Sequence, residues 1–457
     1  MTHTERPLMT DPTFWGLLVT QFLGAFNDNV FKLIVLFLCT DRAKLNRQDD
    51  WQGYAMIFFG LPFILFSGIC GFWADRYSKT RIIILSKVIE IAIMSLGLLV
   101  FWLTEPSKFQ LSLLMGVLFL MGSHSAFFGP SKYGILPELY AKHRLPGING
   151  VFLMTTFVAI IGGAAAAGAL KDALPNLMSV QWICILIAIA GTLTALPIRL
   201  LPPAQPHLRF NPSAVFLDPE TRITLRQQPK LLTALIYSSV FWFVGGVFQP
   251  SVNAMGKLQY GLSDTATGQL AATTAIGIAI GSVLAGMFSR SRFRAGLVRV
   301  AAVGLMLCMA VLGLPGQALD PAPVTAASST SVTAATDAAT VSEFHELSRP
   351  LVSLTGAGLL LTGAGLFAGL FAIPLQVYLQ AMSPAHLKGR MIGAMNLFNW
   401  IGIVISGAFY AICNQVFIRV GASPNAIFGA IAIVILIAAI RFPMQDESLD
   451  ATPLAEG

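Results

Sequence analysis

The sequence predicts an all-α membrane protein whose chain crosses the bilayer twelve times. Of its 457 residues, 55% are apolar and only 11% are charged, and the mean hydropathy is +0.72. Soluble proteins carry about 25% charged residues. The apolar runs here are continuous over about 20 residues, the length that a helix needs to cross a membrane. The strands of an outer-membrane barrel would instead alternate apolar and polar residues. These observations leave a bundle of transmembrane helices as the fold class.

Twelve apolar segments have the length of transmembrane helices. We expect no removable signal peptide, because a basic stretch and a small-residue cleavage site are missing before the first segment. If the N-terminus is cytoplasmic, 19 Lys and Arg residues fall on the cytoplasmic side and 8 on the outer side. Because basic residues favour cytoplasmic loops, both termini are predicted to be cytoplasmic. The segments are centred near residues 26, 63, 92, 118, 159, 190, 243, 275, 303, 363, 402 and 432.

Two long polar connections suggest how the chain is divided. The proline-rich residues 201–230 follow the sixth segment, and residues 316–349, rich in Ala, Ser, Thr and Pro, have the composition of a flexible external loop. Weak internal similarity favours two related halves, since Pro130 aligns with Pro374 at an offset of 244 residues. Such halves typically hold a substrate between them. We expect an N-terminal six-helix bundle, a cytoplasmic linker and a C-terminal six-helix bundle at residues 1–200, 201–230 and 231–457.

Charge and cysteine content limit the partners. The net charge of +7 is explained by basic residues on cytoplasmic loops, so no nucleic acid is predicted as a partner. The five cysteines are isolated within or at the ends of apolar runs, which suggests neither a disulfide framework nor a metal site. Sequence motifs of an enzyme, such as a nucleophile elbow, a phosphate loop or HxxxxD, are also missing. We therefore expect no cofactor and no catalytic residues.

A polar stretch interrupts the first apolar segment. In QFLGAFNDNVFK, residues 21–32, Asp28 lies near the midpoint of the segment. A carboxylate at that depth costs about 3 kcal/mol, so we expect it to face the bundle interior or a wet cavity. One alternative is that Asp28 and Lys32, four residues apart on one helix face, only neutralise each other. Candidate substrate-binding residues in this stretch are Gln21, Asn27, Asp28, Asn29 and Lys32.

Further polar residues lie in the other segments. Gly129 and Pro130 are expected to end the fourth helix, and Lys132, two residues after Pro130, would either line the cavity or anchor the cytoplasmic interface. Lys87 and Glu90, three residues apart, are predicted to pair. His124 would either shuttle a proton or form a hydrogen bond between helices. In the second half the candidates for polar lining are Gln249, Asn253, Gln376, Asn396 and Asn399.

The stretch GFWADRYSKTR, residues 71–81, resembles the signature G-x-L-A-D-R-x-G-R-K of the major facilitator superfamily. The matching residues are Gly71, Ala74, Asp75 and Arg76. The departures are Trp73 and Ser78, and the basic residues at shifted places are Lys79 and Arg81. We expect Gly71 to permit close helix approach, and Asp75 to latch one conformation by meeting a helix N-terminus or a basic residue of the other half. Alternatively, the stretch is only a charged helix end on the cytoplasmic side.

Three longer pieces resemble the lysophospholipid transporter family within that superfamily. They are QFLGAFNDN, FFGPSKYGILPEL at residues 127–139, and PLQVYLQAMSPAHLKGRMIGAMNLFNW at residues 374–400. The resemblance covers all twelve segments. It implies a major facilitator fold that flips lysophospholipids, chiefly lysophosphatidylethanolamine, from the outer to the inner leaflet of a bacterial inner membrane for reacylation. It also implies a separate acyltransferase or acyl-carrier-protein synthetase as a partner, and we expect a monomer.

The polar residues suit such a substrate, whose headgroup carries a phosphate and an ammonium. Asp28 would bind the ammonium, and Lys32 or Lys132 would meet the phosphate. Two other interpretations stay open. The chain would be a proton-coupled carrier of a small amphiphile or drug with Asp28 as its proton site, or a membrane subunit that positions an acyltransferase and transports nothing.

Overall fold

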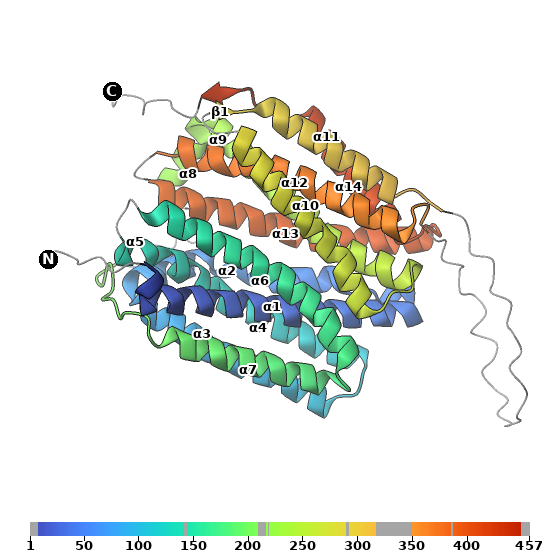
Figure 1. The fold of residues 1–457 in the computed structure, drawn as a ribbon, viewed down its shortest axis with the longest axis horizontal. Coiled ribbons are helices and arrows are strands. Elements are labelled where there is room, and N and C mark those ends of the chain that lie inside the picture. Colours follow the sequence, from blue (N-terminus) through green and yellow to red (C-terminus); the bar gives the residue numbers. More distant parts are fainter. Residues whose placement is uncertain are drawn as a thin grey trace, which may run out of the picture.

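A computed structural model describes residues 8–140, 144–208, 216–217, 219–288, 292–316, 350–384 and 387–448 of the chain (Figure 1). Nearly all of these residues are helical. Each of the twelve predicted centres falls within a different helix. Eleven of the described helices are long and apolar enough to cross a membrane. The twelfth, α14, is apolar but only 15 residues long. The chain is therefore a multi-pass membrane protein.

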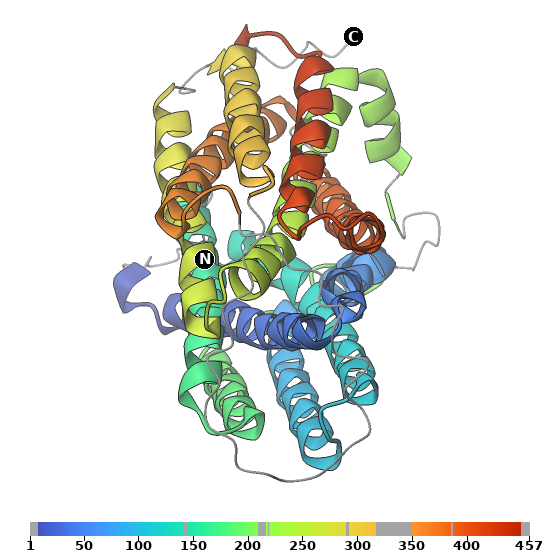
Figure 2. The same cartoon turned by 90° about the vertical axis from the view of Figure 1, so that its right-hand side faces the viewer.

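The long helices form two groups of six. The first group is α1 (Pro12–Leu45), α2 (Gln52–Arg76), α3 (Lys79–Leu103), α4 (Lys108–Gly134), α6 (Leu145–Ala173) and α7 (Leu177–Ala195). The second group is α9 (Pro229–Ala254), α10 (Asp264–Phe288), α11 (Ala295–Leu312), α12 (Leu354–Met382), α13 (Lys388–Arg419) and α14 (Ala426–Ile440). Viewed along the helices, the two groups lie side by side as two bundles (Figure 2).

Short elements connect or cap these helices. The described part of the predicted linker contains the helix α8 (Pro219–Gln227), and α9 continues into a π-helix, η5 (Met255–Gln259). The remaining short elements are the 3₁₀-helices η1 (Leu8–Thr10) and η2 (Arg47–Asp49), the helix α5 (Leu136–Leu139), and the antiparallel strands β1 (Arg292–Phe293) and β2 (Glu447–Ser448). Except for Gly316, the predicted external loop lies outside the described residues. The domain boundaries at residues 200 and 231 stay predictions.

The two bundles together have a terminal end and a distal end. Helix α1 begins at the left of Figure 1, on the side where α5 and α8 lie, and we call this the terminal end. The opposite end, where α1 connects to α2 and where α10 begins, is the distal end. Each bundle buries its own apolar core, around Phe31 and Leu114 in the first and around Tyr378 and Phe428 in the second.

The predicted end of the fourth helix at Pro130 is wrong. Helix α4 continues through Pro130 to Gly134, and Lys132 lies within it. A proline removes one backbone donor, but transmembrane helices tolerate this loss because neighbouring groups satisfy the freed carbonyl. The same tolerance is visible at Pro62, Pro250 and Pro374, which also lie inside helices.

Two glycine pairs join α10 to α12. Gly277 and Gly281 lie one turn apart on α10, and Gly365 and Gly369 lie one turn apart on α12. A Cβ atom added at Gly281 would collide with the backbone carbonyl of Leu366. Small residues at this spacing allow two helix backbones to approach closely, which is a principal source of helix association inside a membrane.

We therefore expect the substitution Gly281→Ala to lower the free energy of unfolding by about 1–3 kcal/mol, because α12 must shift to admit the methyl group. Thermal unfolding of the detergent-solubilised protein measures this effect. Gly286→Ala is the matched control, since Gly286 lies on the same helix and an added Cβ there would meet no atom within 4 Å. Equal melting temperatures for the two variants would contradict the prediction.

Candidate functional site

Helix α1 carries the candidate site on one face. The helix begins at Asp11, whose carboxylate accepts a hydrogen bond from the backbone of Thr13 at 3.0 Å. At 100° per residue, Asp28 and Lys32 point within about 20° of the direction of Gln21, because they follow it by seven and eleven residues. These three residues form a polar stripe along about 16 Å of the helix axis. We call Gln21, Asp28 and Lys32 the α1 stripe.

Asp28 has one carboxylate oxygen without a partner. Its Oδ2 accepts a hydrogen bond from Ser125 of α4 at 2.5 Å, whereas its Oδ1 is buried and has no hydrogen-bond partner. Lys32 donates to Asn29 at 2.7 Å and lies 5.2 Å from the ring centre of Phe59. Among the described residues, no acidic group lies within 4 Å of the Lys32 ammonium. Asp28 and Lys32 therefore form no direct ion pair in this conformation, although the Asp28 carboxylate attracts the Lys32 ammonium over a longer distance.

The other end of the stripe holds a second lysine. The Oε1 of Gln21 accepts hydrogen bonds from Thr156 of α6 at 2.8 Å and from Lys132 of α4 at 3.3 Å. Lys132 is 9% exposed, and its ammonium lies 4.7 Å from the ring centre of Tyr133. No acidic partner within 4 Å is described for Lys132 either. The ammonium groups of Lys32 and Lys132 thus lie on either side of Asp28 along the α1 stripe. The direct neighbours of both ammonium groups are neutral.

The two asparagines beside Asp28 form bonds within the bundle. Asn27 is fully buried and donates to Glu90 of α3 at 2.8 Å, so it faces α3 and lies off the stripe. Asn29 donates to the backbone carbonyl of Ala25 at 2.7 Å and accepts from Lys32. The structure therefore brings Gln21, Asp28, Lys32 and Lys132 together on one side of α1. Asn27 lies on a different side, toward α3.

A cluster of ionisable side chains lies behind the stripe. Lys87 and Glu90 are buried and form an ion pair, which confirms the predicted pairing. His124 of α4 approaches the same carboxylate, with Nε2 3.5 Å from Oε2 of Glu90. A Cβ atom at Gly191 of α7 would lie 2.7 Å from Cε of Lys87. A larger residue at that position would therefore displace the lysine.

The candidates of the second bundle do not join the α1 stripe through a described contact. Gln249 donates to Asn253 at 3.2 Å, and Asn253 donates to Gln52 of α2 at 3.0 Å. Asn399 is buried and accepts from Ser238 of α9 at 3.0 Å, whereas Asn396 is exposed. Their role in substrate binding stays a prediction.

In the signature stretch at the end of α2, Asp75 lies beside Lys79, the first residue of α3, and the role of the stretch as a conformational latch stays a prediction. Asp75 is exposed and lies 3.9 Å from Lys79, which donates to Glu138 at 2.6 Å. All three residues belong to the first bundle, so the expected contact of Asp75 with a basic residue of the other half is not formed. Nor does Gly71 serve close approach, because an added Cβ would meet no atom within 4 Å.

This stretch instead contacts the linker. The backbone carbonyl of Asp75 accepts from the backbone of Gln205 at 2.8 Å, and Arg76 donates to the carbonyl of Leu208 at 3.2 Å. Arg81 is exposed. These two hydrogen bonds hold the first part of the linker, at Gln205 and Leu208, against the end of α2.

Sequence reasoning missed four charged residues that join the bundles at the distal end. Lys171 of α6 and Lys257 of η5 each contact both Asp41 of α1 and Asp264 of α10, with Lys171–Asp41 at 2.6 Å and Lys257–Asp41 at 2.5 Å. We call these four residues the distal charge ring. They were missed because they lie singly at the ends of four different segments, where basic and acidic residues are expected on topological grounds.

A second contact joins the bundles at the same end. Tyr410 of α13 donates to Asp50 at 2.6 Å, and Gln52 donates to the carbonyl of Pro250 at 3.3 Å. A Cβ atom at Gly53 would lie only 2.5 Å from the carbonyl oxygen of Gly407, so α2 and α13 touch backbone to backbone there. The distal end of the two bundles is held together by charge, hydrogen bonds and packing.

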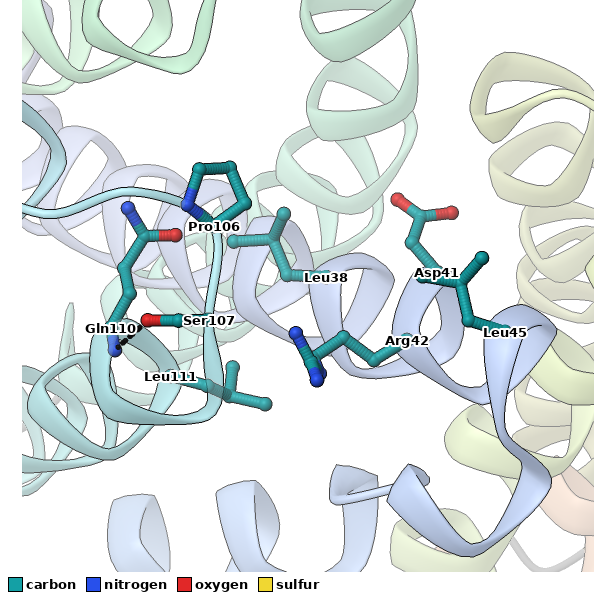
Figure 3. A pocket seen from close by; sticks show the side chains of 8 residues that line it. All are labelled: Leu38, Asp41, Arg42, Leu45, Pro106, Ser107, Gln110 and Leu111. Carbon is teal, nitrogen blue, oxygen red and sulfur yellow. Dashed lines mark hydrogen bonds between the residues drawn. The ribbon is translucent and has the colours of Figure 1, made fainter. Parts of the chain in front are cut away.

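A surface pocket lies beside the distal charge ring (Figure 3). Asp41 and Arg42 both line it but point to different sides of α1. The pocket is about 20 Å along the helix from Asp28, because thirteen residues separate Asp28 from Asp41. It is therefore not part of the α1 stripe. Its lining residues are Leu38, Asp41, Arg42, Leu45, Pro106, Ser107, Gln110 and Leu111.

Comparison with known families identifies the fold. A model of the Major Facilitator Superfamily matches residues 17–407. The chain belongs to the major facilitator superfamily. Its members share a fold of two six-helix halves, so the predicted fold class of twelve transmembrane helices is confirmed. The chain is a transporter by family membership.

Individual relatives agree with this assignment. The chain is 25% identical to the lysophospholipid transporter LplT of Klebsiella pneumoniae over 445 residues, which cover 95% of this chain and 97% of the relative. It is 28% identical to LplT of Serratia proteamaculans over 290 residues, which cover 62% of this chain and 68% of the relative. The resemblance to the lysophospholipid transporter family is thereby confirmed.

Solved structures support the fold of this transporter. A bacterial homologue of the human lysosomal transporter Spinster, in an inward-facing and unoccupied conformation, superposes with a TM-score of 0.64 and 16% identity, covering 95% of this chain and 96% of the other. A mutant of the nucleoside transporter NupG gives a TM-score of 0.64 and 12% identity, covering 94% of this chain and 100% of the other.

Proposed function

We propose that this transporter moves lysophospholipids such as lysophosphatidylethanolamine from the outer to the inner leaflet of a bacterial inner membrane by alternating access. There they would be reacylated by a separate acyltransferase system. Similarity to LplT of Klebsiella pneumoniae along 95% of the chain supports the substrate class. The proposal does not depend on any one short motif, because the similarity extends through both bundles.

The observation that carries the proposal is the charge pattern of the α1 stripe. Asp28 offers a buried carboxylate oxygen without a partner, and Lys32 and Lys132 have only neutral direct neighbours. A zwitterionic headgroup supplies the two missing charges, an ammonium for Asp28 and a phosphate for one of the lysines. Charged groups buried in a membrane protein are stabilised when they are paired in this way. The acyl chain needs no polar contact and would extend toward the lipid.

The position of the inter-bundle contacts supports an alternating-access mechanism. We infer that the terminal end faces the cytoplasm, because the loops at that end carry the larger share of basic residues. The distal charge ring and the Asp50–Tyr410 hydrogen bond would then close the outer side. In this conformation the headgroup would leave the α1 stripe toward the cytoplasm, and transport requires these distal contacts to break.

Reconstitution tests the function directly. The purified protein is placed in liposomes, and labelled lysophosphatidylethanolamine added from outside is followed between leaflets. We expect protein-dependent movement well above that of protein-free liposomes, with no ATP required. Movement no faster than in protein-free liposomes, with the protein shown to be folded, would contradict the proposal. Proton flux driven by a small amphiphile in the same vesicles would then favour the proton-coupled carrier.

A further inference from the structure

The two ring nitrogens of His124 have neighbours that define its protonation. Nδ1 lies 2.7 Å from the backbone carbonyl oxygen of Met121. A carbonyl only accepts hydrogen bonds, so Nδ1 carries a hydrogen. Nε2 faces Oε2 of Glu90 at 3.5 Å. An ionised carboxylate also only accepts, so this second contact is favourable only when a proton lies between Nε2 and the carboxylate.

The charges around His124 balance only with that proton present. The charged groups that face His124 are Lys87 and Glu90 on α3 and Asp28 on α1. On α7, the buried thiol of Cys184 interacts electrostatically with Glu90. Where α2 packs on α4, next to Gly122, it presents the backbone carbonyl of Phe59 and a side-chain carbon of Pro62, neither of which is charged. Lys87 and a protonated His124 balance Glu90 and Asp28. Within the cluster of Lys87, Glu90, Asp28 and His124, a neutral His124 would leave a net charge of −1, which only the more distant Lys32 would offset.

Two pairs of neighbouring residues connect His124 to the α1 stripe. Ser125, next to His124, donates to Asp28, and Asn27, next to Asp28, donates to Glu90. The acid proposed to bind the headgroup and the acid that faces His124 are thus held in one hydrogen-bonded unit. A cation that arrives at Asp28 therefore compensates the same negative charge as the proton on His124.

We propose that His124 and Glu90 form a proton-binding site, and that an ammonium-bearing headgroup at Asp28 displaces its proton. This inference rests on the proposed function. On binding, the Nε2–H bond of His124 breaks and the proton passes to water, while the ammonium keeps all of its own hydrogens. The net charge of the site is unchanged by the exchange. The transporter would then export protons in exchange for the headgroup cation at this step of its cycle.

The test measures lipid binding and proton release together. Lysophosphatidylethanolamine is added to the wild-type protein in detergent and weak buffer containing a pH indicator, and bound lipid is counted in parallel. We expect about one proton released per bound lipid near pH 5.5, one unit below the usual histidine pKa of about 6.5, where the ring is mostly protonated. His124→Gln should bind the lipid and release none. His207→Gln, at an exposed linker position, is the matched control and should behave as wild type.

A second measurement on the wild type does not depend on the folding of a variant. If one proton is displaced, the Kd for the lipid falls by up to about tenfold per pH unit as the pH rises to about 6.5, and levels off above the histidine pKa. Binding of the lipid without proton release and with a Kd independent of pH would overturn the exchange but leave the proposed function intact. Failure of the wild type to bind or move the lipid at any pH would overturn both.

Discussion

The substitution Asp28→Asn is expected to slow lysophosphatidylethanolamine translocation about 30-fold or more. Asparagine keeps the shape of the side chain and the hydrogen bond from Ser125, but removes the negative charge from the oxygen that has no partner in the bundle. Losing one partner of a buried, hydrogen-bonded charge pair costs about 2 kcal/mol or more, and each 1.4 kcal/mol corresponds to a factor of ten. Leaflet-to-leaflet movement in liposomes measures the effect.

A control acid on the same helix makes this experiment specific. Asp11 caps the start of α1 and accepts a hydrogen bond from Tyr140 at 3.0 Å. Burial of Tyr140, and next the nearby Asp11 carboxylate, raise the pKa of the Tyr140 hydroxyl, so it stays a donor at neutral pH. Because asparagine caps helices as well as aspartate does, Asp11→Asn should leave transport unchanged. Undiminished transport by Asp28→Asn would show that Asp28 does not bind the headgroup.

Most of the fold was predictable because membrane insertion depends on segment length and hydropathy alone. Every predicted helix centre lies in an observed helix, even for the 15-residue α14. The error at Pro130 has a local cause. A proline rule from water-soluble helices was applied where the surrounding helices satisfy the freed backbone group.

The candidate site was predictable only in part. The isolation of Asp28 in an apolar segment, and the spacing of Lys87 and Glu90, are visible in the sequence. The partner of Asn27 is not visible, because α1 is buried on nearly all sides and only its contact with α3 decides that Asn27 meets Glu90. Nor does the sequence decide between the two partners expected for Asp75, because the conformation of a transporter determines which half its signature contacts. Here Asp75 lies beside Lys79 of the first bundle.

The distal charge ring was not predictable because its members are far apart in the chain. Asp41 and Lys171 belong to the first bundle, and Lys257 and Asp264 to the second. The backbone amide of Thr265 also donates to Asp172 at 2.7 Å, which extends the contact between the bundles. Two acids and two bases give a neutral ring. Its stability depends on keeping all four charges, because removing one partner from a buried pair leaves the other uncompensated.

The substitution Lys257→Gln is therefore expected to separate the distal ends of the bundles. Lys257 is 3% exposed and contacts both acids of the ring, so its loss leaves Asp41 and Asp264 facing Lys171 alone. We expect this conformation to lose about 3 kcal/mol relative to the open one. Spin labels at the exposed positions Lys44 and Leu351, one on each bundle, should report a longer distance in the variant.

A double substitution distinguishes charge balance from simple loss of packing. Lys257→Gln combined with Asp41→Asn restores a neutral pair of Lys171 and Asp264, which still joins the two bundles. We expect the double variant to recover most of the short distal distance, whereas two independent packing defects would add and lengthen it further. A double variant as open as Lys257→Gln alone would show that the ring does not hold the distal end by electrostatic attraction. Recovery would instead identify the breaking of these ion pairs as a cost that must be offset before the distal end opens.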